Sequence, residues 1–197
     1  MIAMEPVRDK NAVSKLAAYY LNLGQLRNYM LIMLGLYTAL RVSDILLLRW
    51  DDVYDFSNGT VKSFIYLSEK KTGKSKTIAL NADVIAALNM FAASNAVPGV
   101  PLIRNFRTGA AISRVQAYRI VRAAGEAVGI ENRVSCHALR KTFGYHALRE
   151  GTAPMLIMDI FNHKSLNVTM RYLGFTQEDK NNVYLGLSFF KPLKLLS

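Results

Sequence analysis

Residues 135–143 read SCHALRKTF, and this stretch determines how the rest of the chain is interpreted. Ser135 is a favourable N-cap for a helix that would contain the residues after it. His137 and Arg140 lie three positions apart, so their side chains would project from one face of that helix. No Asp or Glu occurs over residues 132–149. We therefore expect the imidazole and the guanidinium to bind an anion that comes from outside the chain.

The composition is that of a folded and strongly basic protein. Of 197 residues, 51% are apolar, and 25 Lys and Arg stand against 14 Asp and Glu, for a formal net charge of +11. This excess favours a polyanion as partner, nucleic acid first and an anionic membrane surface second. The longest uncharged apolar run, residues 28–40, is too short to span a bilayer. The single cysteine, Cys136, excludes an internal disulfide and fits a cytoplasmic protein without a membrane partner.

Caps, turns and hydrophobic periodicity predict a predominantly helical α+β fold, as one domain over residues 1–197, with a small antiparallel sheet near the front. Ser43 is the predicted N-cap of a short helix, and Asn58 with Gly59 predicts a turn. We expect helices over about 9–24, 25–40, 44–50, 81–94, 113–129, 135–151, 154–162 and 165–172, and strands over 60–67 and 75–80 that are joined by a lysine-rich tip at 68–74.

The acid-poor surroundings favour one class of chemistry, phosphodiester cleavage by fixed cations. Such cleavage must neutralise developing negative charge, either with metal ions on carboxylates or with fixed cations. Asp51 and Asp52 are adjacent, so their side chains diverge, and no Cys or His group has zinc spacing. We therefore expect no metal and no cofactor. His163 lies with Tyr172 in a second stretch without carboxylates, whereas His146 is expected to face away and to be structural.

Four segments carry a resemblance to a known family. They are ALRVSDILLLRWDDV at 39–53, KKTGKSKTIAL at 70–80, SCHALRKTFGYHAL at 135–148 and FNHKSLNVTMRYL at 161–173. In this order they resemble the motifs of the tyrosine recombinases, the phage integrase family, over residues 5–172. The resemblance implies the catalytic-domain fold of these DNA breaking and rejoining enzymes.

The resemblance also implies roles for the residues that surround the scissile phosphate. Arg41 and Arg140 match the two arginines that clamp its oxygens, and Asp44 takes the place of the acid that orients the first of them. His137 matches a proton-transfer group, and His163 matches the residue that hydrogen-bonds the phosphate. Arginine suits the clamp because its planar guanidinium makes paired bonds to phosphate oxygens and stays charged.

The nucleophile and the proton donor follow from the same comparison. Tyr172 matches the tyrosine that forms a 3′-phosphotyrosyl link, and the surrounding cations are expected to favour its phenolate. Lys71 matches the lysine that protonates the departing 5′ oxygen, with Lys70 and Lys74 as alternatives. The expected DNA-binding residues are Lys70, Lys74, Lys141, Lys164 and Arg171. Taken singly, each residue also fits a structural role: Arg41 as a surface cation, the lysines as a solvated hairpin, and Tyr172 as a half-buried aromatic.

The sequence departs from the family pattern next to the second histidine. Phe161 and Asn162 replace the usual Leu-Gly, and Lys141 stands where a histidine is common. These changes are expected to affect the efficiency of cleavage, and they remove no catalytic group. We therefore expect site-specific DNA cleavage and rejoining. Two alternatives remain, a DNA-binding accessory protein that does not cut and a relaxing activity like that of the type IB topoisomerases.

The expected partners are double-stranded DNA and further copies of the chain. The resemblance implies a tetramer on DNA and a monomer in its absence, with no small-molecule substrate. We expect no counterpart of the family's amino-terminal core-binding domain before residue 5, so the chain would be either an excised domain or a naturally minimal member of the family. The tail, residues 176–197, contains a predicted helix start and many apolar residues. It is expected either to fold onto its own core or to dock on a neighbouring protomer.

Overall fold

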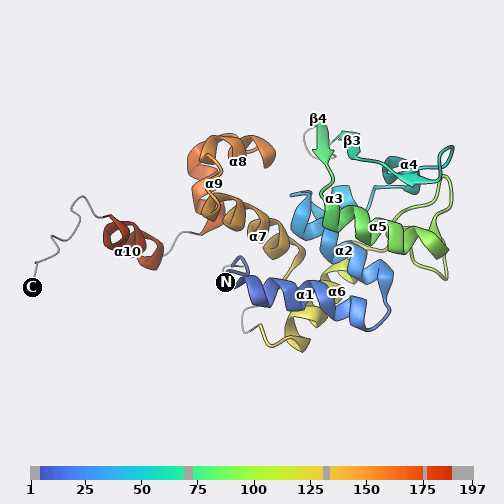
Figure 1. The fold of residues 1–197 in the computed structure, drawn as a ribbon, viewed down its shortest axis with the longest axis horizontal. Helices are drawn as coiled ribbons and strands as arrows, with labels where there is room; N and C mark the ends of the chain where they lie inside the picture. The colour runs from blue at the N-terminus through green and yellow to red at the C-terminus, as the bar shows by residue number, and fades with distance from the viewer. Residues whose placement is uncertain (1–4, 69–72, 131–133, 175–176, 188–197) are drawn as a thin grey trace, which may run out of the picture.

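The computed structural model describes residues 5–68, 73–130, 134–174 and 177–187. Most of these residues are helical, and the predicted α+β class is confirmed (Figure 1). The helices are α1 Lys10–Asn22, α2 Leu26–Tyr37, α3 Val42–Ile45, α4 Trp50–Val53, α5 Ala82–Asn95, α6 Arg114–Ala127, α7 Cys136–Arg149, α8 Pro154–Ile160, α9 Leu166–Leu173 and α10 Gln177–Gly186. The strands are β1 Tyr54–Asp55, β2 Thr60–Val61, β3 Phe64–Ser68 and β4 Ser75–Ala79.

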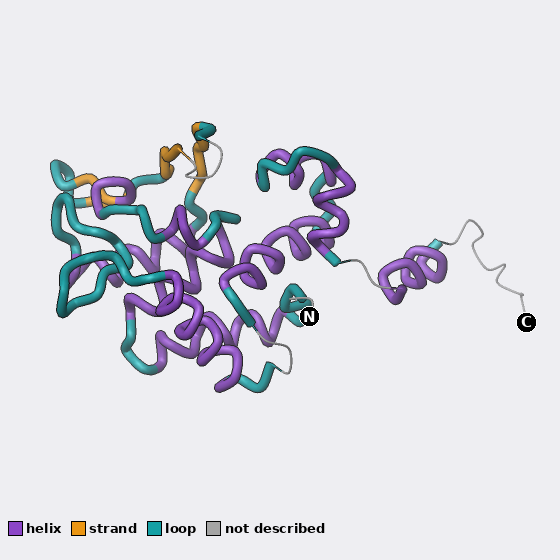
Figure 2. Tube along the Cα trace, turned by 180° about the vertical axis from the view of Figure 1, so that it is seen from behind, coloured by secondary structure: helices purple, strands orange, loops and turns teal. Residues whose placement is uncertain are grey.

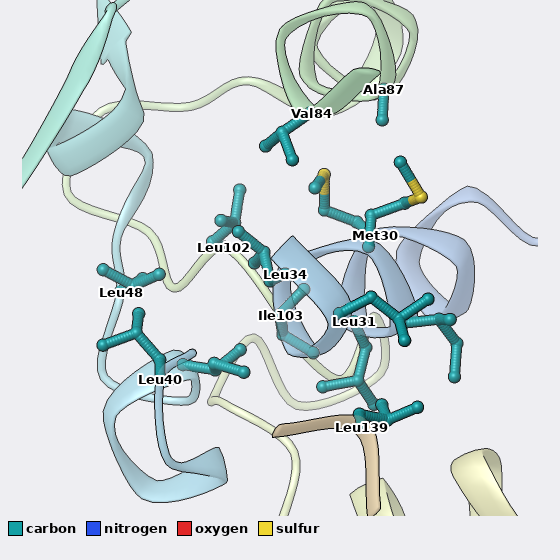
Figure 3. Packing of buried hydrophobic residues seen from close by; sticks show 14 of the residues in the cluster. Met30, Leu31, Leu34, Leu40, Leu48, Val84, Ala87, Leu102, Ile103 and Leu139 are labelled. Carbon is teal, nitrogen blue, oxygen red and sulfur yellow. The ribbon is translucent and has the colours of Figure 1, made fainter. Parts of the chain in front are cut away.

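The main core is built around α2, which is buried along most of its length. Met30, Leu31 and Leu34 are buried there, and α1, α5 and α7 all pack against this helix. Figure 3 shows α5 covering one side of α2 with Val84 and Ala87, while the start of α7 approaches from the opposite side. Because α2 is surrounded, it places the amino-terminal half of α7 at a fixed position in the molecule.

A second, smaller cluster joins α7, α8 and α9. Its buried members are Ala39, Ile157, Phe161 and Leu173. The close approach depends on Gly144 in α7, because a Cβ added there would lie 2.5 Å from Phe161 Cζ and 2.7 Å from Leu173 Cδ2. This cluster holds the helix that contains Tyr172 against the helix that contains His137 and Arg140.

The strands form two antiparallel pairs at one edge of the molecule, β1 with β2 and β3 with β4 (Figure 2). In the second pair Phe64 lies opposite Ala79, and Ser68 lies opposite Ser75. The prediction of a single strand over residues 60–67 is wrong. The Lys62 N–H donates to the Val53 carbonyl, whereas the Ser63 carbonyl accepts from the Leu80 N–H, so the backbone changes partners between the two strands.

The predicted helix over residues 44–50 with Ser43 as its cap is also wrong. Arg41 is the N-cap of α3, with extended backbone, and Ser43 lies inside that helix. The Leu48 carbonyl accepts from Leu102, and the Trp50 N–H donates to Val100. Pairing with the segment near residue 101 therefore interrupts the helix before α4 begins.

The predicted helix over residues 25–40 ends earlier, at Tyr37. The Thr38 hydroxyl donates to the Leu34 carbonyl, and Ala39 adopts a left-handed conformation with φ of 54°. An alanine gives no sequence signal for such a turn, since this region favours glycine. The turn places Arg41 at the start of α3.

The other predicted caps are confirmed. Asn81, Ser113, Ser135 and Ser165 each accept a backbone N–H of the helix that follows, Gln116 completes the predicted capping box, and Pro154 opens α8. Gly59 has φ of 67° in the predicted turn between β1 and β2.

The last described helix, α10, stands apart from the remaining helices (Figure 1). Its residues Val183, Tyr184 and Leu185 are exposed, Leu185 by 84%. Within the described part of the tail, these apolar side chains do not fold onto the chain's own core. Across the residues that the structure describes, no helix is both long and apolar enough to cross a membrane.

Candidate active site

Three of the predicted site residues meet at one cavity of about 590 Å³, between the start of α3 and the start of α7. Arg41, His137 and Arg140 line it together with Ser43 and Arg114. Arg114, at the start of α6, was not among the predicted site residues, because nothing in its local sequence distinguishes it from a surface cation. The structure thus brings together residues that are about a hundred positions apart in the sequence.

Arg140 is buried, with 2% of its surface exposed, and the surrounding backbone orients it. Its Nη1 donates to the Ala39 carbonyl, and its Nη2 donates to the Phe161 carbonyl at 2.8 Å. The guanidinium carbon also lies 4.7 Å from the centre of the Phe161 ring. The left-handed turn at Ala39 therefore aims a carbonyl at this guanidinium, which is pre-oriented as a phosphate clamp requires.

Arg41 occupies a more open position than Arg140. It is half-buried at the start of α3, and its carbonyl accepts the Asp44 N–H at 2.9 Å. The Asp44 side chain is buried, with 2% of the residue exposed. The role of Asp44 in orienting Arg41 stays a prediction.

Tyr172 lies on α9 and faces the start of α7. Its hydroxyl oxygen is 3.4 Å from His137 Nδ1, across 35 positions of sequence. The Tyr172 ring meets the His163 ring edge-on with centroids 5.1 Å apart, and the Phe161 ring at 5.4 Å. Lys141, a predicted DNA-binding residue, places its Nζ 5.0 Å from the centre of the Tyr172 ring. The predicted nucleophile is thus surrounded by the other predicted site residues.

Burial raises the pKa of the Tyr172 phenol above its ordinary value, and the positive charges of Arg140 and Arg41 oppose this rise without reversing it. The two arginines thus favour the phenolate as expected, but desolvation outweighs them. A raised pKa keeps the phenol protonated at neutral pH. Attack by Tyr172 then requires a proton acceptor, and the nearby imidazole of His137 can serve as one.

His163 is half-buried, and Thr169 holds its ring. The Nδ1 atom of His163 lies 3.0 Å from Thr169 Oγ1, and Thr169 is fully buried. This contact restrains the orientation of the His163 ring. Thr169 was not predicted. Its signal in the sequence is a hydroxyl on the apolar stripe of an amphipathic helix.

Of the lysines in the β3–β4 hairpin, the structure describes Lys74 and Lys76. Lys70 and Lys71 lie outside the described residues, and Lys74 is exposed just before β4. Lys76, which was not predicted, donates from Nζ to the Ile160 carbonyl at 2.6 Å and so connects β4 to the end of α8. Lys164 and Arg171 are exposed, and their contact with DNA stays a prediction.

Two residues within the 135–148 segment, His146 and Cys136, have surroundings that fit a structural role and not a catalytic one. His146 Nε2 lies 3.0 Å from the Val7 carbonyl, as expected for a structural histidine. Burial raises the pKa of the Cys136 thiol to about 11, which disfavours a nucleophilic thiolate next to His137. Among the residues that the structure describes, no three His, Cys, Asp or Glu side chains gather as metal ligands would.

Comparisons with known proteins identify relatives of this chain. Residues 7–178 match the model of the phage integrase family. The probable integrase/recombinase YoeC of Bacillus subtilis (strain 168) is 33% identical over 184 residues, which are 93% of this chain and 97% of that protein.

Two solved recombinase structures share the fold. The crystal structure of XerA recombinase aligns with a TM-score of 0.75 at 22% identity, over 93% of this chain and 66% of its own. A XerH site-specific recombinase, in a post-cleavage complex with a palindromic difH substrate, aligns with a TM-score of 0.73 at 20% identity, over 94% of this chain and 55% of its own. This chain therefore spans between half and two thirds of those two chains.

Proposed function

The chain belongs to the phage integrase family of tyrosine recombinases, and we propose that it cuts and rejoins DNA at specific sites through a covalent link to Tyr172. One observation carries the assignment of the nucleophile: the Tyr172 hydroxyl lies 3.4 Å from His137 Nδ1, beside the buried guanidinium of Arg140. All these groups come from one chain. The proposed cleavage therefore occurs in cis, with each protomer attacking the phosphate that its own arginines hold.

The proposed reaction is an in-line displacement at phosphorus. The Tyr172 oxygen bonds to the phosphorus while the bond to the 5′ oxygen breaks, and the phenolic proton passes to His137. Arg41, Arg140 and His163 stabilise the negative charge that develops on the phosphate oxygens. Lys71 gives its proton to the departing 5′ oxygen. The phosphotyrosyl bond conserves the energy of the broken linkage, so a second 5′ hydroxyl can reverse the step and reseal a strand.

The proposed partners are double-stranded DNA and further copies of this chain. The net charge of +11 supports a polyanion as partner, and the XerH neighbour is bound to its DNA substrate. The exposed apolar residues of α10 support docking of the tail on a neighbouring protomer, in a tetramer that joins two DNA sites. We propose action on DNA in the cytoplasm, which fits the single cysteine.

The test is covalent trapping on nicked oligonucleotides from the flanks of the chain's own gene. Wild-type protein should form an adduct that resists denaturation, and peptide mapping should place it on Tyr172. Tyr172→Phe should abolish the adduct and leave DNA affinity nearly unchanged, since it removes one hydroxyl. The matched control is Tyr184→Phe, on an exposed tyrosine of α10, which should form the adduct normally. Addition of EDTA should have no effect, because fixed cations supply the charge.

The alternatives give different results in the same assays. A DNA-binding accessory protein would bind equally well with either tyrosine variant and form no adduct. A relaxing enzyme would form the adduct without bringing two DNA sites together. An adduct that maps to another tyrosine would contradict the proposed assignment.

A further inference from the structure

Two consecutive backbone carbonyls at the carboxyl end of α8 accept hydrogen bonds from cationic side chains. Lys76 Nζ donates to the Ile160 carbonyl at 2.6 Å, and Arg140 Nη2 donates to the Phe161 carbonyl at 2.8 Å. The last carbonyls of a helix have no partner within it and carry its negative partial charge, so they attract cations. One of these cations belongs to the proposed phosphate clamp. The other belongs to the hairpin in which the predicted proton donor occurs.

The contacts of the hairpin show where it is anchored. At its base, Ile65 and Ile78 are buried in the main core, opposite each other in the β3–β4 pairing. Two residues nearer the tip, Lys76 is half-buried and contacts α8, whereas Ser75 and Lys74 are exposed. The space between the hairpin and α8 is a cavity of about 260 Å³ that Lys76, Ile160 and Asn162 help to line. The Lys76 contact thus joins the described part of the hairpin to the end of α8, where the next carbonyl accepts from Arg140.

We propose that Lys76 is a positioning residue that fixes the β3–β4 hairpin relative to the phosphate clamp, so that the lysine five positions earlier can reach the leaving 5′ oxygen. The proposal rests on the proposed function, in which Lys71 is the proton donor. The two bonds to the end of α8 give the hairpin and Arg140 a common support. A shift of the hairpin away from this support would leave the clamp intact but misplace the acid.

Lys76 could instead act only as a cap that stabilises the end of α8. Substrates with different leaving groups distinguish this structural role from the positioning role. A 5′ oxygen must be protonated as it leaves, whereas a 5′ sulfur in the same bridging position departs as a thiolate, since thiols ionise near pH 8.5. With sulfur, the Tyr172 oxygen still bonds to phosphorus, the phosphorus–sulfur bond breaks, and no acid is needed. A defect in positioning the acid should vanish on this substrate. A defect in the clamp or in folding should persist.

The experiment measures the rate of adduct formation on matched oligonucleotides with bridging oxygen or bridging sulfur. Lys76→Met should slow the reaction about tenfold or more on oxygen, part of the 10²–10⁴-fold that a general acid typically contributes, and should match wild type on sulfur. Lys76→Arg should retain the wild-type rate on both substrates, because a guanidinium also donates to a carbonyl. Lys71→Met should be slower still on oxygen and recover on sulfur, and Lys71→Arg should not rescue it.

The matched control is Lys62→Met. Lys62 Nζ also donates to a backbone carbonyl, that of Asp51 at 2.6 Å, but at the opposite end of the strands. This variant loses the same charge and the same kind of bond, so its rates should equal those of wild type. Thermal melting of each variant reports whether it is folded.

Several outcomes would overturn the proposal. Equal slowing of Lys76→Met on oxygen and sulfur would make Lys76 a structural cap, and a normal rate on oxygen would make it dispensable. If Lys76→Arg is as slow as Lys76→Met on oxygen and recovers on sulfur, Lys76 is itself the acid. Recovery of Lys76→Met without recovery of Lys71→Met would show that another group donates the proton. Failure of the wild-type protein to form any adduct would instead contradict the proposed function, and the positioning role with it.

Discussion

Arg41 and Arg140 have the same proposed role, but their surroundings predict different results for their removal. Arg140→Ala leaves the Ala39 and Phe161 carbonyls without this donor inside the protein, so it should lower the free energy of unfolding by about 1–3 kcal/mol as well as stop cleavage. Arg41→Ala, at a half-buried helix start, should slow cleavage by about 10²–10³ with little change in melting. Adduct kinetics and thermal melting measure the two effects separately.

Lysine at either position should restore little of the cleavage rate, because its single ammonium cannot make the paired bonds of a guanidinium. Near-normal cleavage by Arg41→Ala would mean that the clamp lies elsewhere. A normal melting temperature for Arg140→Ala would show that its two carbonyl bonds do not stabilise the fold.

At the same scale, the sequence predicted residue types better than backbone conformations. His137, Arg140, His163 and Tyr172 were predicted from motif order, and the structure brings them together. The departure at Asn162 is now explained, since its φ of 52° lies in the left-handed region, where glycine is favoured and asparagine is tolerated. The partner Thr169 was missed, because its bond to His163 depends on how α9 is rotated.

At the scale of elements, Gly144 controls how closely α7 approaches α8 and α9. Gly144→Ala would place a methyl group 2.5 Å from Phe161 Cζ, and the Phe161 ring also supports Arg140. We expect a loss of about 1–3 kcal/mol from overpacking, together with slower cleavage because α9 must move. Denaturant unfolding and adduct kinetics provide the measurements.

Gly186→Ala is the matched control, since nothing lies within 4 Å of a Cβ at that position of α10. It should be neutral or slightly stabilising, as alanine favours helix. Unchanged stability and cleavage for Gly144→Ala would show that the cluster can open at little cost and does not fix the position of Tyr172.

Helices with strong caps were predicted closely, whereas elements set by long-range pairing were not. Ser135 and Ser165 mark their helix starts through local bonds to backbone N–H groups, which the sequence reveals. The break after α3 and the division of the predicted strand depend on partners near residues 53, 80 and 101. Local propensity contains no information about such partners.

For the whole molecule, the order of the motifs predicted the family and the fold class. It did not predict the hydrogen bonds that connect segments far apart in the sequence. The Ala39 carbonyl that orients Arg140 is 101 positions away from it, and the contact of Lys76 with Ile160 spans 84 positions. Both contacts involve backbone carbonyls, which every residue possesses. No pattern of side chains could have indicated them.

A contact between distant segments also connects the start of α10 to the domain. Arg8 Nη2 donates to the Gly174 carbonyl at 2.6 Å, where α9 ends in a left-handed residue, and Arg8 Nη1 pairs with Asp179 at 3.0 Å. Tyr145 lies under the same guanidinium, with 5.0 Å from its carbon to the ring centre. Arg8 thus joins the end of the nucleophile helix to the beginning of α10. We expect this contact to direct the exposed apolar residues of α10 away from their own core.

Removal of residues after Thr176 should therefore leave a folded domain that forms the covalent adduct but does not bring two DNA sites together or exchange strands. The change in stability should be limited to the loss of the Arg8–Asp179 pair, whose side chains are 29% and 11% exposed, because the apolar side chains of α10 are already exposed. Thermal melting, adduct formation and a two-site recombination assay on the truncated protein measure the three properties. Asp179→Asn in the full chain is the finer variant, which should reduce recombination while Asp179→Glu retains it. If truncation unfolds the domain, α10 belongs to its own core, and docking on a neighbouring protomer is wrong.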